Sequence, residues 1–151
     1  MEANRRRNIN SMRTKSDERT TTIILDSNFL FVPLRFGVDI FEEFKRLLVN
    51  VRCVVPSPVL EELRFLKEEA KTSTKEAEFA LTMASRCEII HEAVESGETV
   101  DEVILRLARS WRCPVATNDS ELKQLLRSEG IPVIYLRQRA YLEIEGVASL
   151  Q

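Results

Sequence analysis

The sequence predicts an α/β fold, a three-layer α/β/α sandwich around a mainly parallel sheet of five strands. Short apolar runs alternate along the chain with longer segments whose apolar residues recur at helical spacing. The apolar runs, such as CPVAT and PVIYL, do not alternate with polar residues, which is typical of strands covered on both faces. Alternating strands and helices favour a parallel sheet between two helical layers.

In the first half of the chain, TTIILD at 21–26 is the first expected strand. The next segment has apolar residues at Phe41, Phe44, Leu47 and Leu48, which predicts a helix. RCVVP reads as a strand that ends at its proline, and Ser57 followed by Pro58 is typical of an N-cap and a first helical turn. The expected elements are strands at 21–26 and 52–56, and helices at 41–49, from 57 to about 71, and at 74–86.

In the second half, CEIIH is a third strand and ESGET a loop. Thr99 and Glu102 have the spacing of a capping box and predict the start of the next helix. Val100, Ile104, Leu107 and Trp111 would form its apolar stripe. The expected elements are strands at 87–91, 113–117 and 132–136, and helices from 100 to 111 and at 119–129.

Composition limits the classes of protein that the chain can represent. Its 151 residues are 44% hydrophobic and 30% charged, which predicts one globular domain at 21–145, a loosely held basic arm at 1–20 and a C-terminal tail at 146–151. No apolar run suits a membrane helix, and the arm lacks the apolar stretch of a secretory signal. The three cysteines lack CxxC spacing, so we expect reduced thiols and a cytoplasmic protein. With a net charge of −2, any contact with nucleic acid must be local.

Four acids fall at one predicted edge of the sheet. Asp26 ends the first strand and Asp119 follows the fourth, so the two meet if these strands are neighbours. Glu62 borders the apolar stripe of its helix, whereas Glu61 points away from it. Asp101 lies in the first turn of the helix after Thr99. It shares a face of that helix with residues that we expect to be buried. Strand ends and helix starts share one edge in a parallel α/β fold.

Each acid also has an ordinary structural interpretation. Asn118 or Asp119 suits a helix N-cap, with Glu121 closing a capping box from Asn118. Taken together, four neighbouring carboxylates repel one another unless they bind protons or cations. Oxygen ligands select Mg²⁺ or Mn²⁺, and the presence of a single histidine, His91, argues against a histidine-based metal site or a catalytic triad. The pattern therefore predicts metal-dependent hydrolysis of phosphodiesters.

Four segments resemble a known family when they are taken in order. ILDSNFL, PSPVLEELRFL, GETVDEVILRLA and CPVATNDSELKQLL are similar to the motifs of PIN-domain ribonucleases, and the resemblance covers residues 22–141. It implies a PIN-like fold and a metal-dependent endoribonuclease that uses Mg²⁺ or Mn²⁺. The resemblance implies catalytic and metal-binding roles for Asp26, Glu62, Asp101 and Asp119, and supporting roles for Asn28, Thr117 and Glu102.

Within that family, GIPVIYLRQRAYLEI and VATNDSELK are most similar to PIN nucleases that process small-subunit rRNA precursors, of the archaeal and eukaryotic type. The alternatives are a PIN toxin of a toxin–antitoxin pair and a non-catalytic RNA-binding or assembly module. A nucleotide-binding Rossmann protein is disfavoured, because DSNFLF stands where its glycine-rich loop would be. The expected partners are single-stranded or structured RNA, an antitoxin or a ribosome-assembly protein, and a second copy in a homodimer.

Basic residues suggest where RNA would bind. Arg137, Arg139 and Tyr141 follow the fifth strand, where arginines suit phosphates and a tyrosine suits an unpaired base. An ordinary solvated strand end is the alternative interpretation. We expect weak, salt-sensitive attraction from Arg5, Arg6, Arg7 and Arg13, and a solvated face from Lys67, Lys71 and Lys75.

Overall fold

The computed structural model describes residues 20–69 and 74–146. The predicted basic arm, except Thr20, and the predicted C-terminal tail, except Gly146, lie outside the described residues, as does Lys71. Among the described residues, no helix has the length and apolar character needed to cross a membrane.

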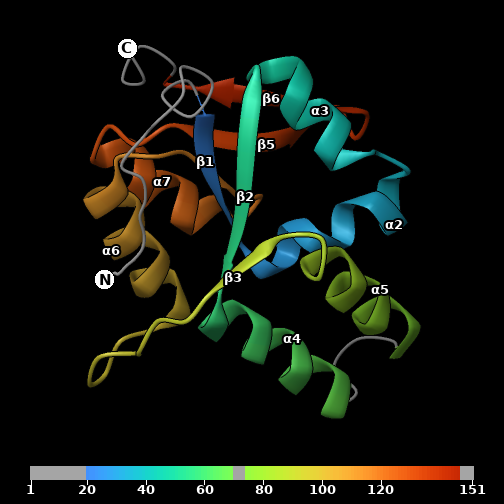
Figure 1. Ribbon diagram of the computed structural model, residues 1–151, viewed down its shortest axis with the longest axis vertical. Helices are drawn as coiled ribbons and strands as arrows, with labels where there is room; N and C mark the ends of the chain where they lie inside the picture. The colour runs from blue at the N-terminus through green and yellow to red at the C-terminus, as the bar shows by residue number, and fades with distance from the viewer. Residues whose placement is uncertain (1–19, 70–73, 147–151) are drawn as a thin grey trace, which may run out of the picture.

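The structure has the predicted α/β architecture, with one strand more than expected. The strands run in the order β3-β2-β1-β4-β5-β6, so β1 lies between β4 and β2, and Figure 1 shows β1 beside β2. The first five strands are parallel, and β6 pairs with β5 in the antiparallel direction. Their bounds are β1 Thr20–Leu25, β2 Asn50–Pro56, β3 Glu88–Ile90, β4 Val115–Ala116, β5 Val133–Arg137 and β6 Tyr141–Glu145.

All five predicted strands are present, and β6 was not predicted because the turn between β5 and β6 lacks the usual sequence signal. Tight hairpin turns require positive φ and normally use Asn-Gly or Asp-Gly. Here Gln138 and Arg139 adopt φ values of 54° and 58°, and the Ala140 N–H donates to the Arg137 carbonyl at 3.1 Å. The turn is therefore tight although neither residue favours the left-handed region.

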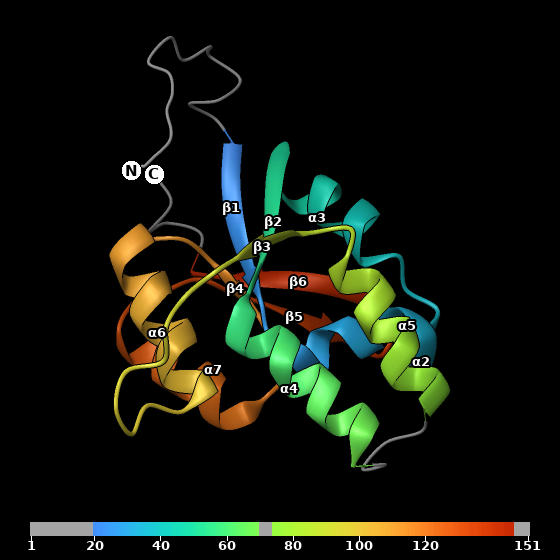
Figure 2. The same cartoon turned by 60° about the horizontal axis from the view of Figure 1, so that its bottom comes forward.

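The helices form the two outer layers of the sandwich. Because crossovers between parallel strands are right-handed, reversing the strand order at β1 places α6 and α7 on the face opposite the other helices, as Figures 1 and 2 show. Two short helical segments after β1 were not predicted, since each is too short to show helical periodicity. The bounds are η1 Ser27–Phe31, α2 Val32–Phe36, α3 Ile40–Leu47, α4 Ser57–Glu68, α5 Thr74–Ala84, α6 Val100–Trp111 and α7 Ser120–Ser128.

The helix starts agree only in part with the predicted caps. The capping box of α6 is confirmed: the Thr99 N–H donates to Glu102 Oε1 at 2.9 Å, and the Glu102 N–H donates to Thr99 Oγ1 at 3.1 Å. The N-cap role of Ser57 was wrong, because Pro56 occupies that position. The Ser57 hydroxyl instead accepts from the Glu92 N–H at 3.0 Å, which ties the start of α4 to the segment after β3.

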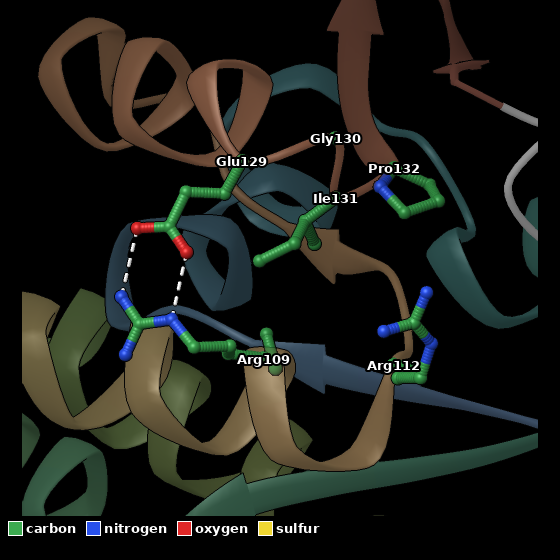
Figure 3. A pocket seen from close by; sticks show the side chains of 7 residues that line it. Arg109, Arg112, Glu129, Gly130, Ile131 and Pro132 are labelled. Carbon is green, nitrogen blue, oxygen red and sulfur yellow. Dashed lines mark hydrogen bonds and ion pairs between the residues drawn. The ribbon is translucent and has the colours of Figure 1, made fainter.

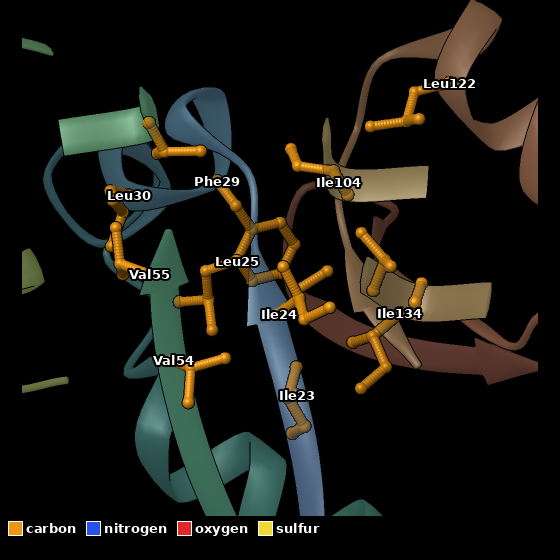
Figure 4. Close-up of a cluster of buried hydrophobic side chains, with 14 of the residues drawn as sticks. Ile23, Ile24, Leu25, Phe29, Leu30, Val54, Val55, Ile104, Leu122 and Ile134 are labelled. Atoms are coloured by element: carbon orange, nitrogen blue, oxygen red, sulfur yellow. The ribbon is translucent and has the colours of Figure 1, made fainter. Parts of the chain in front are cut away.

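Side chains from both faces of β1 fill the core. Ile23, Ile24 and Leu25 are fully buried, and Figure 4 shows Leu25 on the side of Val55 and Ile24 on the side of Ile134. Burying a side chain of this size contributes about 1.5–3 kcal/mol to folding. Trp111 departs from the predicted stripe of α6, since 38% of it is exposed. The packed core holds the end of β1 firmly, and the next residue is Asp26.

The three cysteines are free thiols in the structure, as expected from their spacing. Cys113 is buried, and Cys53 and Cys87 are partly buried. The neighbouring Cys87 thiol and burial raise the pKa of Cys53, and the Cys87 thiol donates to the Met83 carbonyl at 3.8 Å.

Candidate active site

The site lies where β1 and β4 end side by side. The Asp26 N–H donates to the Ala116 carbonyl at 3.0 Å, so the condition for bringing Asp26 near the end of β4 is met. Asp26 is 4% exposed. Its Oδ1 accepts from the Ser27 N–H at 2.8 Å, and its Oδ2 accepts from Thr117 Oγ1 at 2.7 Å and Asn28 Nδ2 at 3.2 Å. Three donors thus orient one buried carboxylate.

Thr117 and Asn28 join the ends of the two strands. The Thr117 hydroxyl donates to Asp26 and accepts from the Asp119 N–H at 3.1 Å. Asn28 donates to Asp26, and its Oδ1 accepts from the Asn118 N–H at 3.3 Å. Each side chain therefore contacts Asp26 and also holds the loop that presents Asp119.

Asp119 does cap α7, as the ordinary interpretation predicts. Its Oδ1 accepts from the Leu122 N–H at 2.8 Å. The predicted capping box between Asn118 and Glu121 was wrong, because Asn118 Oδ1 accepts instead from the Leu136 N–H at 2.8 Å. In the described part of the chain nothing donates to Asp119 Oδ2, so capping occupies one of its oxygens and leaves the other available.

Glu62 and Asp101 reach the same region from α4 and α6. Glu62 is half-buried and Glu61 exposed, in agreement with the predicted helix faces. Glu62 Oε1 accepts from the Ser27 hydroxyl at 2.6 Å. Ser27 was not among the predicted site residues, and its only signal is its place directly after Asp26. Asp101 is half-buried, whereas Glu102 is exposed and engaged in the capping box.

The four acids act on one another electrostatically. Burial raises the pKa of Asp26 to about 6, with Asp101 and Glu62 adding to the rise and the Thr117 and Ser27 hydrogen bonds opposing it. Burial also raises the pKa of Asp101, and the charges of Asp119 and Glu62 raise it further. No lysine or arginine among the described residues forms an ion pair with any of the four. The site is therefore a partly buried, uncompensated group of carboxylates.

The donor chemistry of this group fits a divalent ion, although the side chains do not form a finished metal site. All donors are carboxylate or hydroxyl oxygens, the ligands that Mg²⁺ and Mn²⁺ prefer. In residues 20–69 and 74–146, no three acidic, histidine or cysteine side chains are already placed to share an ion. In this arrangement Glu62 is held by Ser27 and Asp119 by the start of α7.

The predicted RNA-binding residues lie at the hairpin of β5 and β6, on the same edge of the sheet. Arg137 forms an ion pair with Glu143 at 2.7 Å. Tyr141 lies opposite Arg137 in the strand pairing and is half-buried. The Arg139 guanidinium lies over the Phe36 ring, 5.4 Å from its centroid. Arg139 is thus less constrained by charge pairing than Arg137.

A partly open hollow of about 70 Å³ lies at the opposite edge of the sheet, between the end of α6 and the segment that leads into β5 (Figure 3). Arg109 and Glu129 border it and form two hydrogen bonds of 2.7 Å. It shares no residue with the acid group and is small for a ligand site.

The chain is similar to PIN domains and to named ribonucleases in three kinds of comparison. Residues 23–139 match the family model described as a PIN like domain. The chain is 34% identical to Ribonuclease VapC4 of Methanocaldococcus jannaschii over 128 residues, covering 83% of this chain and 97% of that protein. It is 28% identical to Ribonuclease VapC9 of Archaeoglobus fulgidus over 147 residues, covering 95% and 98%. The solved PIN domain endonuclease Utp24 superposes with a TM-score of 0.68 and 27% identity, covering 82% of this chain and 90% of Utp24.

Proposed function

The chain belongs to the PIN-like domain family, and from that premise we propose that it is a metal-dependent endoribonuclease. The supporting observation is the uncompensated group of Asp26, Glu62, Asp101 and Asp119 at the carboxyl edge of the sheet. Two relatives are named ribonucleases and a third an endonuclease. We assign RNA as the substrate and Mg²⁺ or Mn²⁺ as the cofactor on this basis.

The four acids would hold one or two ions. A divalent ion bound there lowers the pKa of water and stabilises the negative charge that develops on the phosphoryl group and its leaving oxygen. Thr117 and Asn28 fix the orientation of Asp26 before any ion binds. Glu62 and Asp101, each half-buried, are the candidates for positioning the attacking water or accepting its proton.

The decisive experiment separates capping from catalysis. Asp39 is a matched control for Asp119, because it caps α3 through a 3.2 Å bond from the Glu42 N–H and is exposed. Asn is as good an N-cap as Asp. Asp119→Asn and Asp39→Asn should therefore unfold at urea midpoints no lower than that of the parent, whereas only Asp119→Asn should lose cleavage of single-stranded RNA with Mn²⁺.

Asp26→Asn should lose cleavage as well. Parent-like cleavage by both Asp26→Asn and Asp119→Asn would reject the assignment. The non-catalytic RNA-binding alternative predicts instead that the parent neither cleaves RNA nor takes up Mn²⁺ in a calorimetric titration.

We propose processing of small-subunit rRNA precursors as the biological role, on the likeness to Utp24 and the C-terminal motifs. A toxin paired with an antitoxin is the second candidate, favoured by the higher identity to Ribonuclease VapC4. Expression in a host without a partner distinguishes them: a toxin arrests growth only when Asp26 is intact, whereas a processing enzyme is tolerated.

The proposed homodimer is tested separately by light scattering of the purified chain. A mass twice that of the monomer supports the dimer, and the monomer mass rejects it.

A further inference from the structure

A groove of about 310 Å³ adjoins the acids. It opens between η1 and α2 on one side and α7 and β5 on the other. Asn28 and Asn118 line the end nearest the acids, and Asn28 is hydrogen-bonded to Asp26. Phe36 and Leu136 line its apolar part. The groove thus adjoins the candidate active site through Asn28, and it differs from the acids in having a partly apolar lining.

Its charge is the opposite of that of the acids. The Lys123 ammonium, which lines the groove, lies 4.9 Å from the centroid of the Tyr135 ring. The Arg139 guanidinium lies over Phe36. Neither cation forms an ion pair with a carboxylate in the described part of the chain, whereas Arg35, also on the groove, pairs with Glu76 at 3.1 Å. Lys123 lowers the pKa of Glu145 from beyond ion-pair distance, and both Lys123 and Arg139 can still approach a ligand phosphate.

The turn that presents Arg139 is strained. The left-handed region costs a residue other than glycine about 1–2 kcal/mol, and both Gln138 and Arg139 adopt it. Strain of this kind is retained where the surrounding structure requires it, and it concentrates at functional sites. Here it places a cation at the rim of the groove.

The groove also offers a free polar donor. Asn118 Oδ1 accepts from the Leu136 N–H, which assigns the oxygen and the nitrogen of this amide. Its NH₂ group donates to no group among the described residues. A ligand in the groove would meet an amide donor, the Phe36 ring and the Lys123 ammonium, with Arg139 beside Phe36 at the rim.

We propose that this groove binds one nucleotide of single-stranded RNA beside the bond to be cleaved, with Lys123 and Arg139 on its backbone phosphate and Phe36 against its base. The proposal rests on the proposed function and specifies its substrate. Cations here offset the repulsion between RNA and the four acids. An unpaired base can present its face to an aromatic ring, which a base inside a duplex cannot. An acidic peptide would use the cations but not the ring.

The test is binding of a short, fluorescein-labelled oligouridylate in the presence of a chelator, so that no cleavage occurs. Lys123→Ala and Arg139→Ala are each expected to weaken binding about fivefold at 0.1 M salt. Each should also reduce, by about 0.7, the steepness with which the logarithm of the association constant falls with the logarithm of the salt concentration. Lys45→Ala is the matched control, since Lys45 is exposed on α3 and pairs with Glu42. It should change neither quantity.

A second variant tests the base. Phe36→Leu is expected to weaken binding of oligouridylate about fivefold and to leave binding of an abasic strand of the same length unchanged. Equal weakening of both strands, or none, would overturn the base contact and favour a site for anions such as an acidic peptide. Its urea midpoint is compared with that of the parent to confirm folding.

Failure of this proposal can be distinguished from failure of the proposed function. If the parent cleaves RNA with Mn²⁺ while Lys123→Ala and Arg139→Ala bind oligouridylate as Lys45→Ala does, the groove is not the subsite and the nuclease assignment stands. If the groove variants lose binding but the parent never cleaves, the groove stands as a binding site for single-stranded RNA, whereas the nuclease assignment and the position beside a cleaved bond both fail.

Discussion

In the absence of metal, the unfolding free energy of Asp26→Asn is expected to increase relative to that of the parent protein as the pH rises. The folded protein raises the pKa of Asp26 from its ordinary value of 3.8 to about 6, chiefly by burial. A carboxyl whose folded pKa is raised favours folding while it is protonated. That contribution is fully present below pH 3.8 and is lost as the pH rises through about 6. The Asn side chain does not titrate and so does not lose it.

The size of the effect follows from the two pKa values. One pKa unit corresponds to about 1.4 kcal/mol, so the full penalty on the charged carboxylate is about 3 kcal/mol. Between pH 4 and pH 8, the difference in unfolding free energy between Asp26→Asn and the parent should grow by about 2–2.5 kcal/mol. If Asn forms weaker hydrogen bonds to Ser27 or Thr117, the difference in unfolding free energy shifts by the same amount at every pH. Only the change of that difference with pH is therefore diagnostic.

The assay is urea unfolding of both proteins in a chelator, followed by far-ultraviolet circular dichroism at several pH values. Acids that do not act on Asp26 cancel in the difference, including Glu43, Glu98 and Glu129, whose pKa values are lowered by hydrogen bonds from arginines. At pH 8, Mn²⁺ at about 100 times its Kd should then stabilise the parent by about 2.7 kcal/mol and the variant by much less. A difference that stays constant from pH 4 to pH 8 would refute the view that Asp26 is a desolvated acid.

Three further predictions concern Thr117, which contacts Asp26, and the residues at the start of α6. Thr117→Val removes a hydroxyl donor to Asp26, so the pKa of Asp26 should rise further and the unfolding free energy at pH 8 should fall by about 1–2 kcal/mol; unchanged urea midpoints would argue against the hydrogen bond. Asp101→Asn should slow RNA cleavage at least about 100-fold, whereas Glu102→Gln keeps an acceptor for the capping box and should retain the parent rate; equal losses in a timed cleavage assay would mean that the two acids are not distinct. Thr99→Ala should lower the unfolding free energy by about 1 kcal/mol through loss of the cap, without changing the rate of RNA cleavage. A large loss of cleavage would instead indicate that the start of α6 has a direct role in the reaction.

The amino-acid sequence by itself determined the elements whose signals are local. Runs such as TTIIL and PVIYL became buried parallel strands, and the periodic segments became α3 to α7 with ends shifted by a few residues. The Thr99–Glu102 capping box formed as expected. The faces of α4 were also predictable, with Glu62 half-buried and Glu61 exposed. Each of these outcomes depends on residues within one or two turns of each other, which is why a linear pattern suffices.

Only the tertiary structure decided the contacts between distant segments. The strand order put β1 beside β4, and Thr117 thereby reached Asp26 across 91 positions of the chain. Ser27 holds Glu62, and the groove combines residues from η1, α2, α7 and β5. The strand β6 also depended on pairing, since its turn carries no local signal. Such contacts follow from strand order and from packing of whole elements, which short-range propensities do not encode.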